Sequence, residues 1–320
     1  MLTKSGAGCL EPTGENLYFP PKKGDYIYFE GPTFEPNQGF RYANASWAAD
    51  ASMFAYARYG KTRLAEDEFR KILSDRGFTA IETIGDCFVD NASTARGYFA
   101  TNDRFALLAF RGTEKDNPND VAADADALLV PQVPLGGRGA GQVHQGFQKY
   151  LNTVWSRVGE LVRGYRGTHA KQEICITGHS LGAAIATLVF HQLSDDATTL
   201  YTFGCPRVGD QAFCQDVSWI AQSRGCYRIV DNEDVVTHIP FHTRFPLYDQ
   251  PKCALFWINS AGVVQENPDS TPSDFRAVED MALGFLGGLI RTTIPRPLAD
   301  HSPVRYCHWL SLKAAAISAH

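Results

Sequence analysis

The sequence predicts an α/β fold in which a mostly parallel sheet is covered by helices on both faces. Short apolar segments typical of buried strands alternate with helix-like segments along most of the chain. The 320 residues contain no internal repeat or low-complexity tract. We therefore expect a single domain over residues 41–320. Residues 1–40, rich in Pro, Gly and aromatic residues without periodicity, are expected to form an extended arm on its surface.

Two helices and a hairpin are expected before the alternating region. One helix is predicted within residues 44–60 and a second within residues 64–78, ending near Gly77. Two apolar runs on either side of Asn102 and Asp103 predict a β-hairpin. The apolar face of the first helix is formed by Trp47, Met53, Phe54 and Ala57.

The alternating region begins with the second strand of that hairpin, Phe105 to Phe110. A helix is then predicted from about Phe147 to Val162, followed by the strand "EICITG" and a helix from Leu181 to Leu193. The remaining predicted strands are "TTLYTFG", "CYRIVDN" and "ALFWINS".

Composition and charge argue against several classes of protein. The 30 Lys and Arg residues are outnumbered by 35 Asp and Glu, for a net charge of -5, so no broad basic surface is available to bind nucleic acid. No window reaches 18 apolar residues, so no transmembrane segment is expected.

The N-terminus does not resemble a signal peptide, which favours the cytoplasm unless the chain is a processed, secreted form. Eight Cys residues without a CxxC pair argue against a zinc or thioredoxin-like site, and no metal is expected.

The segment Gly178–Gly182, "GHSLG", has the pattern of a nucleophile elbow. A Gly-x-Ser-x-Gly pattern is weak evidence alone, but this one lies between a predicted strand and a predicted helix, as the elbow requires. The two glycines allow strand and helix to approach closely. The turn would expose the hydroxyl of Ser180, while the helix start offers N–H groups to a developing anion.

A serine nucleophile needs a base and an acid, and in folds with this elbow both follow the serine in the chain. The strand "CYRIVDN" ends in three candidate acids, Asp231, Glu233 and Asp234. Among the later histidines, His301 precedes a Pro-containing turn in a loop and is favoured as the base. His308 lies in a helical stretch beside Trp309. The other histidines that follow the serine are His191, inside the elbow helix, and His238, His242 and His320.

Several ordered blocks resemble the class 3 lipases, the fungal-type triacylglycerol lipase family of α/β-hydrolases. They run from about residue 97 to residue 310 and are more specific together than any one is alone. The blocks are "FALLAFRGT", "VHQGFQKYL", "ICITGHSLGAAIA", "YTFGCPRVGD", "DNEDVVTHIP" and "DHSPVRY".

This resemblance implies the α/β-hydrolase fold and a Ser-His-Asp triad. Ser180 would be the nucleophile, Asp234 the acid and His301 the general base. The oxyanion hole would be formed by the backbone N–H of Leu181 together with Thr113. Catalysis would pass through an acyl-enzyme on Ser180 and would need no metal or organic cofactor.

Two departures from the family pattern leave alternatives open. Thr237 stands where many members have Pro after the acid, which keeps Asp231 in competition with Asp234. Tyr306 is separated from His301 by four residues rather than two, which keeps His308 as an alternative base.

Two segments are candidates to cover the site. Residues 114–129, the lid position in the family, are acidic and poor in bulky apolar residues, so they offer little surface to an oil interface. Residues 274–300 carry an apolar stripe at helical spacing that includes Met281, Phe285 and Leu289. This stripe is either ordinary core packing or an acyl-pocket wall or mobile flap.

We therefore expect a carboxylic ester hydrolase that acts on short or medium acyl esters, with weak interfacial activation and weak contact with a lipid interface. One alternative is an interfacially activated triacylglycerol lipase or phospholipase A1. An alternative of another class is a non-catalytic lipid-binding protein on the same fold. A thiol-reactive site at Cys175 is a weaker possibility, because a Cys in a buried strand is commonly inert.

Overall fold

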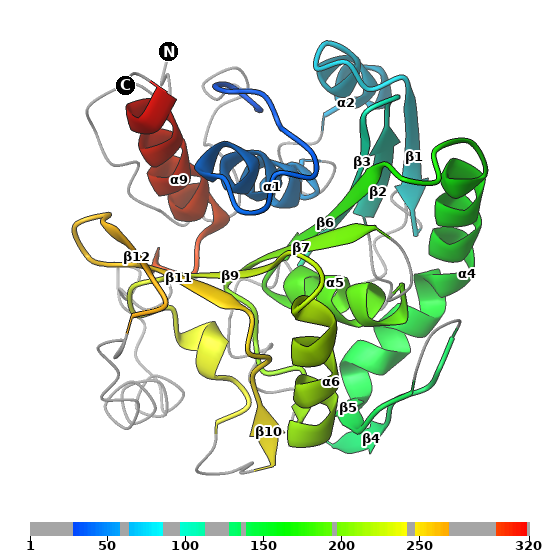
Figure 1. Cartoon of the computed structure of the whole chain (residues 1–320), viewed down its shortest axis with the longest axis vertical. Helices are drawn as coiled ribbons and strands as arrows, with labels where there is room; N and C mark the ends of the chain where they lie inside the picture. Colours follow the sequence, from blue (N-terminus) through cyan, green and yellow to red (C-terminus); the bar gives the residue numbers. More distant parts are fainter. Residues whose placement is uncertain are drawn as a thin grey trace.

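The computed structural model describes residues 28–57, 64–85, 97–112, 128–135, 139–193, 197–241, 247–268 and 299–318. A large twisted sheet crosses the molecule, with helices on both of its faces (Figure 1). Its strand order is β1-β2-β3-β6-β7-β9-β11-β12. The α/β-hydrolase architecture expected from the sequence is therefore present.

The centre of this sheet is parallel and its edges are antiparallel. Neighbouring strands run parallel from β3 through β6, β7 and β9 to β11. The hairpin predicted around Asn102 is β2 paired with β3, and the Asn102 side chain accepts hydrogen bonds from the backbone N–H of Arg104 and Phe105 at 2.9 and 3.0 Å. The strands are β1 (Ala80–Ile84), β2 (Gly97–Thr101), β3 (Phe105–Phe110), β6 (Glu173–His179), β7 (Thr198–Phe203), β9 (Cys226–Asp231), β11 (Ala254–Ile258) and β12 (Val264–Glu266).

Each face of the sheet packs against its own group of helices. Ile174 and Ile176 on β6 belong to the core shared with α4, α5 and α6, whereas Cys175 between them belongs to the core shared with α1 and α9. This alternation is the two-residue period of a strand buried on both faces. The helices are α1 (Tyr42–Phe54), α2 (Glu66–Ser74), α4 (Gln145–Thr168), α5 (Leu181–Gln192), α6 (Gln211–Ala221) and α9 (Pro303–Ser318).

A second, small antiparallel sheet was not predicted. Its order is β10-β8-β5-β4. Strands of two or three residues are too short to show a periodic pattern in the sequence. They are β4 (Leu129–Pro131), β5 (Gln142–His144), β8 (Gly209–Asp210) and β10 (Tyr248–Asp249).

The described part of the N-terminal arm, residues 28–40, contains no helix or strand, and two of its aromatic side chains are buried in the core. Phe29 and Phe34 are each 1% exposed and pack with residues of α1. Phe40 stacks on Phe256 of β11, with 3.6 Å between ring centroids. The burial of Phe29 and Phe34 and the stacking of Phe40 are favourable enough to hold this segment against the core.

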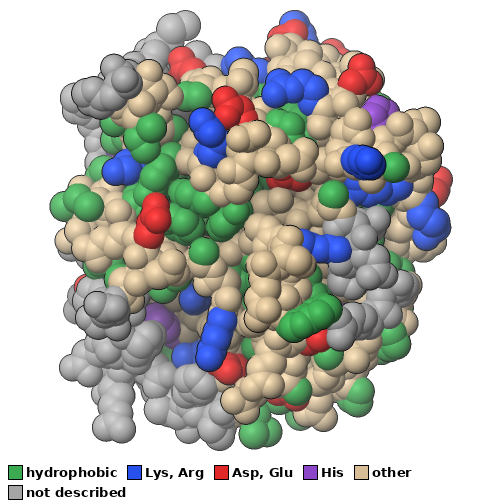
Figure 2. All heavy atoms as spheres, in the orientation of Figure 1, with side chains coloured by type: hydrophobic (Ala, Val, Ile, Leu, Met, Phe, Trp, Pro, Cys, Tyr) green, Lys and Arg blue, Asp and Glu red, His purple; other side chains and the backbone are tan. Residues whose placement is uncertain are grey.

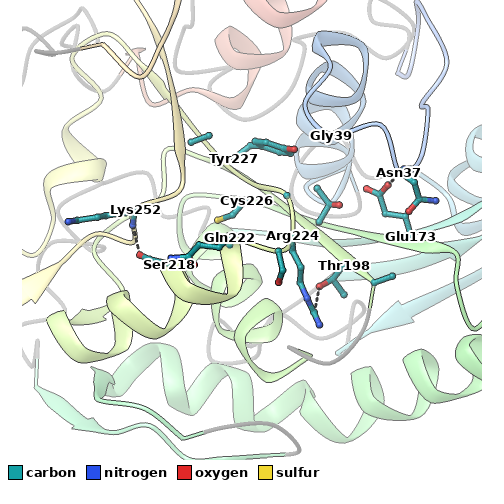
Figure 3. A pocket seen from close by; sticks show the side chains of 16 residues that line it. Asn37, Gly39, Glu173, Thr198, Ser218, Gln222, Arg224, Cys226, Tyr227 and Lys252 are labelled. Carbon is teal, nitrogen blue, oxygen red and sulfur yellow. Dashed lines mark hydrogen bonds between the residues drawn. The ribbon is translucent and has the colours of Figure 1, made fainter.

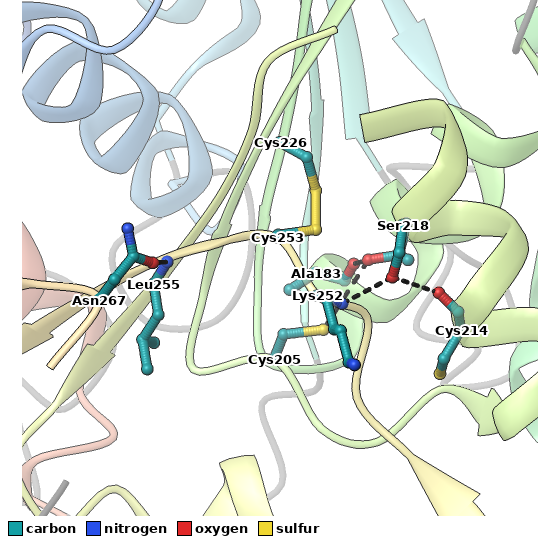
Figure 4. Close-up of a disulfide and its surroundings, with 10 residues drawn as sticks. Ala183, Cys205, Cys214, Ser218, Cys226, Lys252, Cys253, Leu255 and Asn267 are labelled. Atoms are coloured by element: carbon teal, nitrogen blue, oxygen red, sulfur yellow. Dashed lines mark hydrogen bonds between the residues drawn. A yellow bond between two sulfur atoms is a disulfide. The ribbon is translucent and has the colours of Figure 1, made fainter. Parts of the chain in front are cut away.

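A disulfide joins Cys226, the first residue of β9, to Cys253, just before β11 (Figure 4). The other cysteines of the described residues, Cys175, Cys205, Cys214 and Cys307, are buried and form no disulfide. Burial raises the pKa of the Cys175 thiol well above its ordinary value, so a reactive thiolate at this position is disfavoured.

Within the described part of the chain, no helix is both long and apolar enough to span a membrane. The same residues contain no cluster of His, Cys, Asp and Glu side chains arranged to hold a metal ion.

Candidate active site

Ser180 lies in the sharp turn between β6 and α5. Its φ of 58° and ψ of -128° place it in a region that residues with a Cβ rarely occupy, so the turn is strained. A Cβ at Gly178 would overlap the carbonyl of Gly182, and a Cβ at Gly182 would overlap the carbonyl of Phe110. The turn therefore depends on glycine at both positions, for the reason that the sequence pattern indicated.

The imidazole of His301 is paired with the carboxylate of Asp234. Nδ1 of His301 lies 2.9 Å from both Oδ1 and Oδ2 of Asp234. Because a carboxylate only accepts, the Nδ1 position carries the proton, and Nε2 is left as the basic nitrogen. Asp234 follows β9 and begins the short helix η2 (Val235–His238), where its side chain also accepts from the N–H of Val236 at 3.0 Å.

Asp234 is fully buried but remains ionised. Burial raises the pKa of this carboxyl, yet the charge and hydrogen bond of His301 and the hydrogen bond from Tyr306 outweigh it, so the pKa lies below its ordinary value. Tyr306 Oη donates to Oδ2 of Asp234 at 2.6 Å. The spacing of Tyr306 from His301, a departure from the family pattern, does not prevent this contact.

The competing carboxylate Asp231 has a different partner. Its Oδ2 accepts from Nε of Arg305 at 2.9 Å, whereas Oδ1 is buried with no hydrogen-bond partner among the described residues. Burial, with smaller contributions from the nearby Asp300 and Asp234, raises the pKa of Asp231 to about 8 in spite of Arg305. Asp234, rather than Asp231, is the carboxylate in contact with His301.

The remaining candidates lie elsewhere. His308, on α9, has its ring centroid 4.9 Å from that of Trp309. His191, in the last turn of the elbow helix, pairs with Asp216 at 2.8 Å. His238 lies in η2, while His242 and His320 fall outside the described residues. Glu233 donates its backbone N–H to Asp300 at 3.3 Å.

A buried histidine that the sequence argument set aside connects several parts of the site. Nε2 of His179 lies 2.6 Å from the carbonyl oxygen of His301, and Nδ1 lies 2.9 Å from Tyr56 Oη. Tyr56 Oη also accepts from the N–H of Gly112 at 3.1 Å. Burial, together with the nearby His301, lowers the pKa of His179 well below its ordinary value, so its ring is neutral. Chain order excluded His179 as a base, and no sequence signal linked it to Tyr56.

The proposed oxyanion and acyl-pocket residues are only partly described. Leu181 is the first residue of α5, where backbone N–H groups point out of the helix end. Thr113 lies outside the described residues, directly after Gly112. The apolar residues Met281, Phe285 and Leu289 also lie outside them.

The glycine at position 204 touches the acid and the base at once. A Cβ at Gly204 would lie 2.5 Å from Oδ2 of Asp234 and 2.8 Å from Nδ1 of His301. Gly204 has a φ of +57°, which a residue with a side chain seldom adopts. The "FGCPRVG" block therefore places a residue without a side chain next to the Asp234–His301 pair.

A cavity of about 860 Å³ lies away from these residues (Figure 3). Its lining includes Glu173, Thr198, Cys226 and Ala254, the first residues of β6, β7, β9 and β11. Ser180 and Asp234 instead follow the last residues of β6 and β9, at the carboxyl ends where sheets of this class place their chemistry. The cavity is therefore at the opposite end of the sheet from the candidate triad.

A family model described as "Lipase (class 3)" matches residues 107–244, which include the serine turn and Asp234. Residues 107–244 are thus similar to the class 3 lipases. Among similar proteins, the "Lipase" of Rhizomucor miehei is 31% identical over 157 residues, covering 47% of this chain and 40% of that protein. The "Secreted mono- and diacylglycerol lipase 3" of Gibberella zeae is 28% identical over 182 residues, covering 52% and 56%.

Solved lipase structures share the fold. The lipase from Rhizopus microsporus var. chinensis superposes with a TM-score of 0.57 at 22% identity, covering 84% of this chain and 90% of that one. The mono- and diacylglycerol lipase from Aspergillus oryzae gives 0.55 at 22% identity, covering 85% and 95%. This chain spans between 28% and 56% of the length of the first five curated relatives that it matches.

Proposed function

We propose that this protein is a member of the class 3 lipase family and a serine carboxylic ester hydrolase. The observation that supports this proposal most directly is the 2.9 Å contact between His301 Nδ1 and Asp234. It lies at the same end of the sheet as the strained turn that holds Ser180. A non-catalytic lipid-binding protein on this fold would need neither a strained serine nor a buried, ionised carboxylate beneath an imidazole.

The proposed reaction is acyl transfer in two halves. Nε2 of His301 takes the proton of Ser180 Oγ while Oγ bonds to the ester carbonyl carbon, and the same nitrogen returns the proton to the departing alcohol. Water, activated by His301, then releases the carboxylic acid from Ser180. Asp234 keeps its charge and stabilises the imidazolium formed in each half.

The oxyanion of each tetrahedral intermediate would be bound by the N–H of Leu181 and by Thr113. Leu181 lies at the N-terminus of α5, where unpaired N–H groups and the helix dipole favour negative charge. Gly112, the residue before Thr113 in the chain, donates its N–H to buried Tyr56, which supports a fixed backbone position for Gly112.

We propose short or medium acyl esters as substrates, with weak interfacial activation and only weak contact with lipid surfaces. The acidic segment before Leu128 offers little apolar area, and the net charge of -5 opposes binding to anionic lipid. On the face shown in Figure 2, basic and acidic side chains are interspersed rather than gathered into one field. Met281, Phe285 and Leu289 are proposed to line the acyl pocket.

An interfacial lipase is the second candidate, because the stripe of Met281, Phe285 and Leu289 could face an oil surface and the relatives include proteins named as mono- and diacylglycerol lipases. Initial rates on p-nitrophenyl esters from C2 to C16, with and without a triglyceride emulsion, separate the two. Our proposal expects the highest rates on short or medium chains and little change with emulsion. A steep rise at the emulsion threshold would favour the lipase, and no rate above that of Ser180→Ala would contradict hydrolysis.

A further inference from the structure

Arg305 joins two buried carboxylates that come from different parts of the chain. Its Nε donates to Oδ2 of Asp231 at 2.9 Å, and its Nη2 lies 3.1 Å from Oδ1 of Asp300. The Arg305 side chain is 6% exposed and both carboxylates are fully buried. A planar guanidinium can hold two carboxylates at a fixed separation, which a lysine ammonium cannot.

The two carboxylates lie next to the proposed acid and base. Asp231 is the last residue of β9, three residues before Asp234, and Asp300 directly precedes His301. Through Arg305, the segment that carries Asp234 is therefore tied to the segment that carries His301.

Asp300 adds a second tie between the same segments. Its Oδ2 accepts from Nδ2 of Asn232 at 2.8 Å and from the N–H of Glu233 at 3.3 Å. Residues 231–233 thus contact Asp300 or Arg305 at every position, immediately before Asp234.

Stability alone gives little reason for this arrangement. Burying charged groups is costly, and a buried ion pair can often be replaced by apolar side chains without loss of stability. Here one guanidinium faces two carboxyl groups, Asp231 and Asp300, with a third at Asp234, and burial together with these neighbours raises the pKa of Asp231. At the start of α9, the side chains of Val304, Tyr306 and Cys307 are already buried and pack in the core.

We propose that Arg305 is a positioning residue, which keeps His301 aligned on Asp234 by bridging Asp231 and Asp300. The inference rests on the proposed ester hydrolase function. Arg305 itself touches neither substrate nor the reacting atoms, so its loss is expected to act on turnover through the alignment of the imidazole.

The test compares Arg305→Lys with a matched control, Arg224→Lys. Arg224 also donates from one side chain to two groups, the carbonyl of Leu193 at 2.9 Å and Oγ1 of Thr198 at 3.1 Å, but it lies at the opposite end of the sheet. For a short p-nitrophenyl ester we expect Arg305→Lys to lower kcat by about 10-fold or more with KM nearly unchanged, since misplacement by about 1 Å can cost about 100-fold. Arg224→Lys should leave both constants unchanged.

A second readout does not depend on hydrolysis. The proton on Nδ1 of His301, assigned by its loss in His301→Gln, should give a low-field NMR resonance in the wild type and in Arg224→Lys. We expect it to shift or broaden in Arg305→Lys. If the wild type cleaves no ester but this change is seen, the proposed function fails and the positioning role stands.

Unchanged kcat and an unchanged resonance in Arg305→Lys would overturn the proposal. If that variant does not fold, Asp300→Asn takes its place, because it keeps the arginine and removes one arm of the bridge. Asp300→Asn should give the same fall in kcat and the same change in the His301 resonance. If its kcat and its resonance are those of the wild type, the proposal is again overturned.

Discussion

The side chain of His179 hydrogen-bonds to the backbone of His301. Because the His301 carbonyl oxygen only accepts, Nε2 of His179 donates to it at 2.6 Å, and Nδ1 accepts from Tyr56 Oη at 2.9 Å. His179 directly precedes Ser180. The loop of the proposed base and the turn of the proposed nucleophile are thus connected through one neutral, buried ring.

Replacing His179 with Phe should lower both stability and turnover. The substitution leaves a buried carbonyl unpaired, which costs about 1–3 kcal/mol, and frees the loop of His301. Urea unfolding and kcat on a short ester measure the two effects. The control is His191→Phe, which breaks the 2.8 Å contact with Asp216 at the other end of α5 and should lower stability only. Equal kcat in the two variants would argue against the connection.

Gly204→Ala should disable the site more than it destabilises the fold. The new Cβ would press on Asp234 and His301, and we expect kcat to fall by about 100-fold through displacement of the imidazole. Gly77→Ala is the matched control, since Gly77 also has positive φ, +87°, but nothing lies within 4 Å of the added carbon. Its cost, about 1 kcal/mol, should appear in unfolding alone. Similar kcat for both variants would contradict the geometry.

Ser180→Gly should make the protein more stable while abolishing activity. Glycine adopts the φ of 58° without the strain that a Cβ creates, so we expect the free energy of unfolding to rise by about 1 kcal/mol over Ser180→Ala. Urea unfolding of the wild type and both variants gives the comparison. A Ser180→Gly protein no more stable than Ser180→Ala would mean that the turn stores no strain.

The stability of the protein should carry a pH dependence from Asp231. Its pKa is raised from 3.8 to about 8 by burial, so between these values the folded state holds a proton that the unfolded state releases. Stability from this group is therefore fully present below about pH 4 and is lost as pH rises through about 8.

Asp231→Asn should remove this loss. Between pH 5 and pH 9 the free energy of unfolding should therefore fall less in the variant than in the wild type. We expect the two falls to differ by more than about 1 kcal/mol, since one pKa unit corresponds to about 1.4 kcal/mol. Chemical unfolding at several pH values measures it. Asp75→Asn, in an exposed pair with Lys71, should keep the wild-type slope. An Asp231→Asn curve parallel to the wild type would contradict the raised pKa.

Much of the sheet was predictable because its central strands are apolar on both faces. The predicted strands at 105–110, 173–178, 198–204, 226–232 and 254–260 correspond to β3, β6, β7, β9 and β11 within two residues at their ends. The helix predicted from 147 to 162 runs from 145 to 168, beyond its apolar stripe, because Arg166 hydrogen-bonds the carbonyl of His169 at 3.3 Å, in the following turn, and that of Ala197 at 2.8 Å, just before β7.

Other features depend on contacts between distant segments and had no local signal. The pattern "DNED" could not distinguish Asp231 from Asp234, because the choice is made by Arg305 and His301, about 70 positions later. The pairing of Cys226 with Cys253 and the burial of Phe29 likewise follow from tertiary packing.

Labelling by a serine-directed fluorophosphonate tests the central proposal most directly. We predict a single adduct, located by mass spectrometry on Ser180, that is absent in Ser180→Ala and forms much more slowly in His301→Gln and Asp234→Asn. Asp231→Asn, which removes one arm of the Arg305 bridge but keeps the carboxylate that contacts His301, should slow labelling less than Asp234→Asn does. Labelling that persists in Ser180→Ala, or that is equally fast without His301, would contradict the proposed triad.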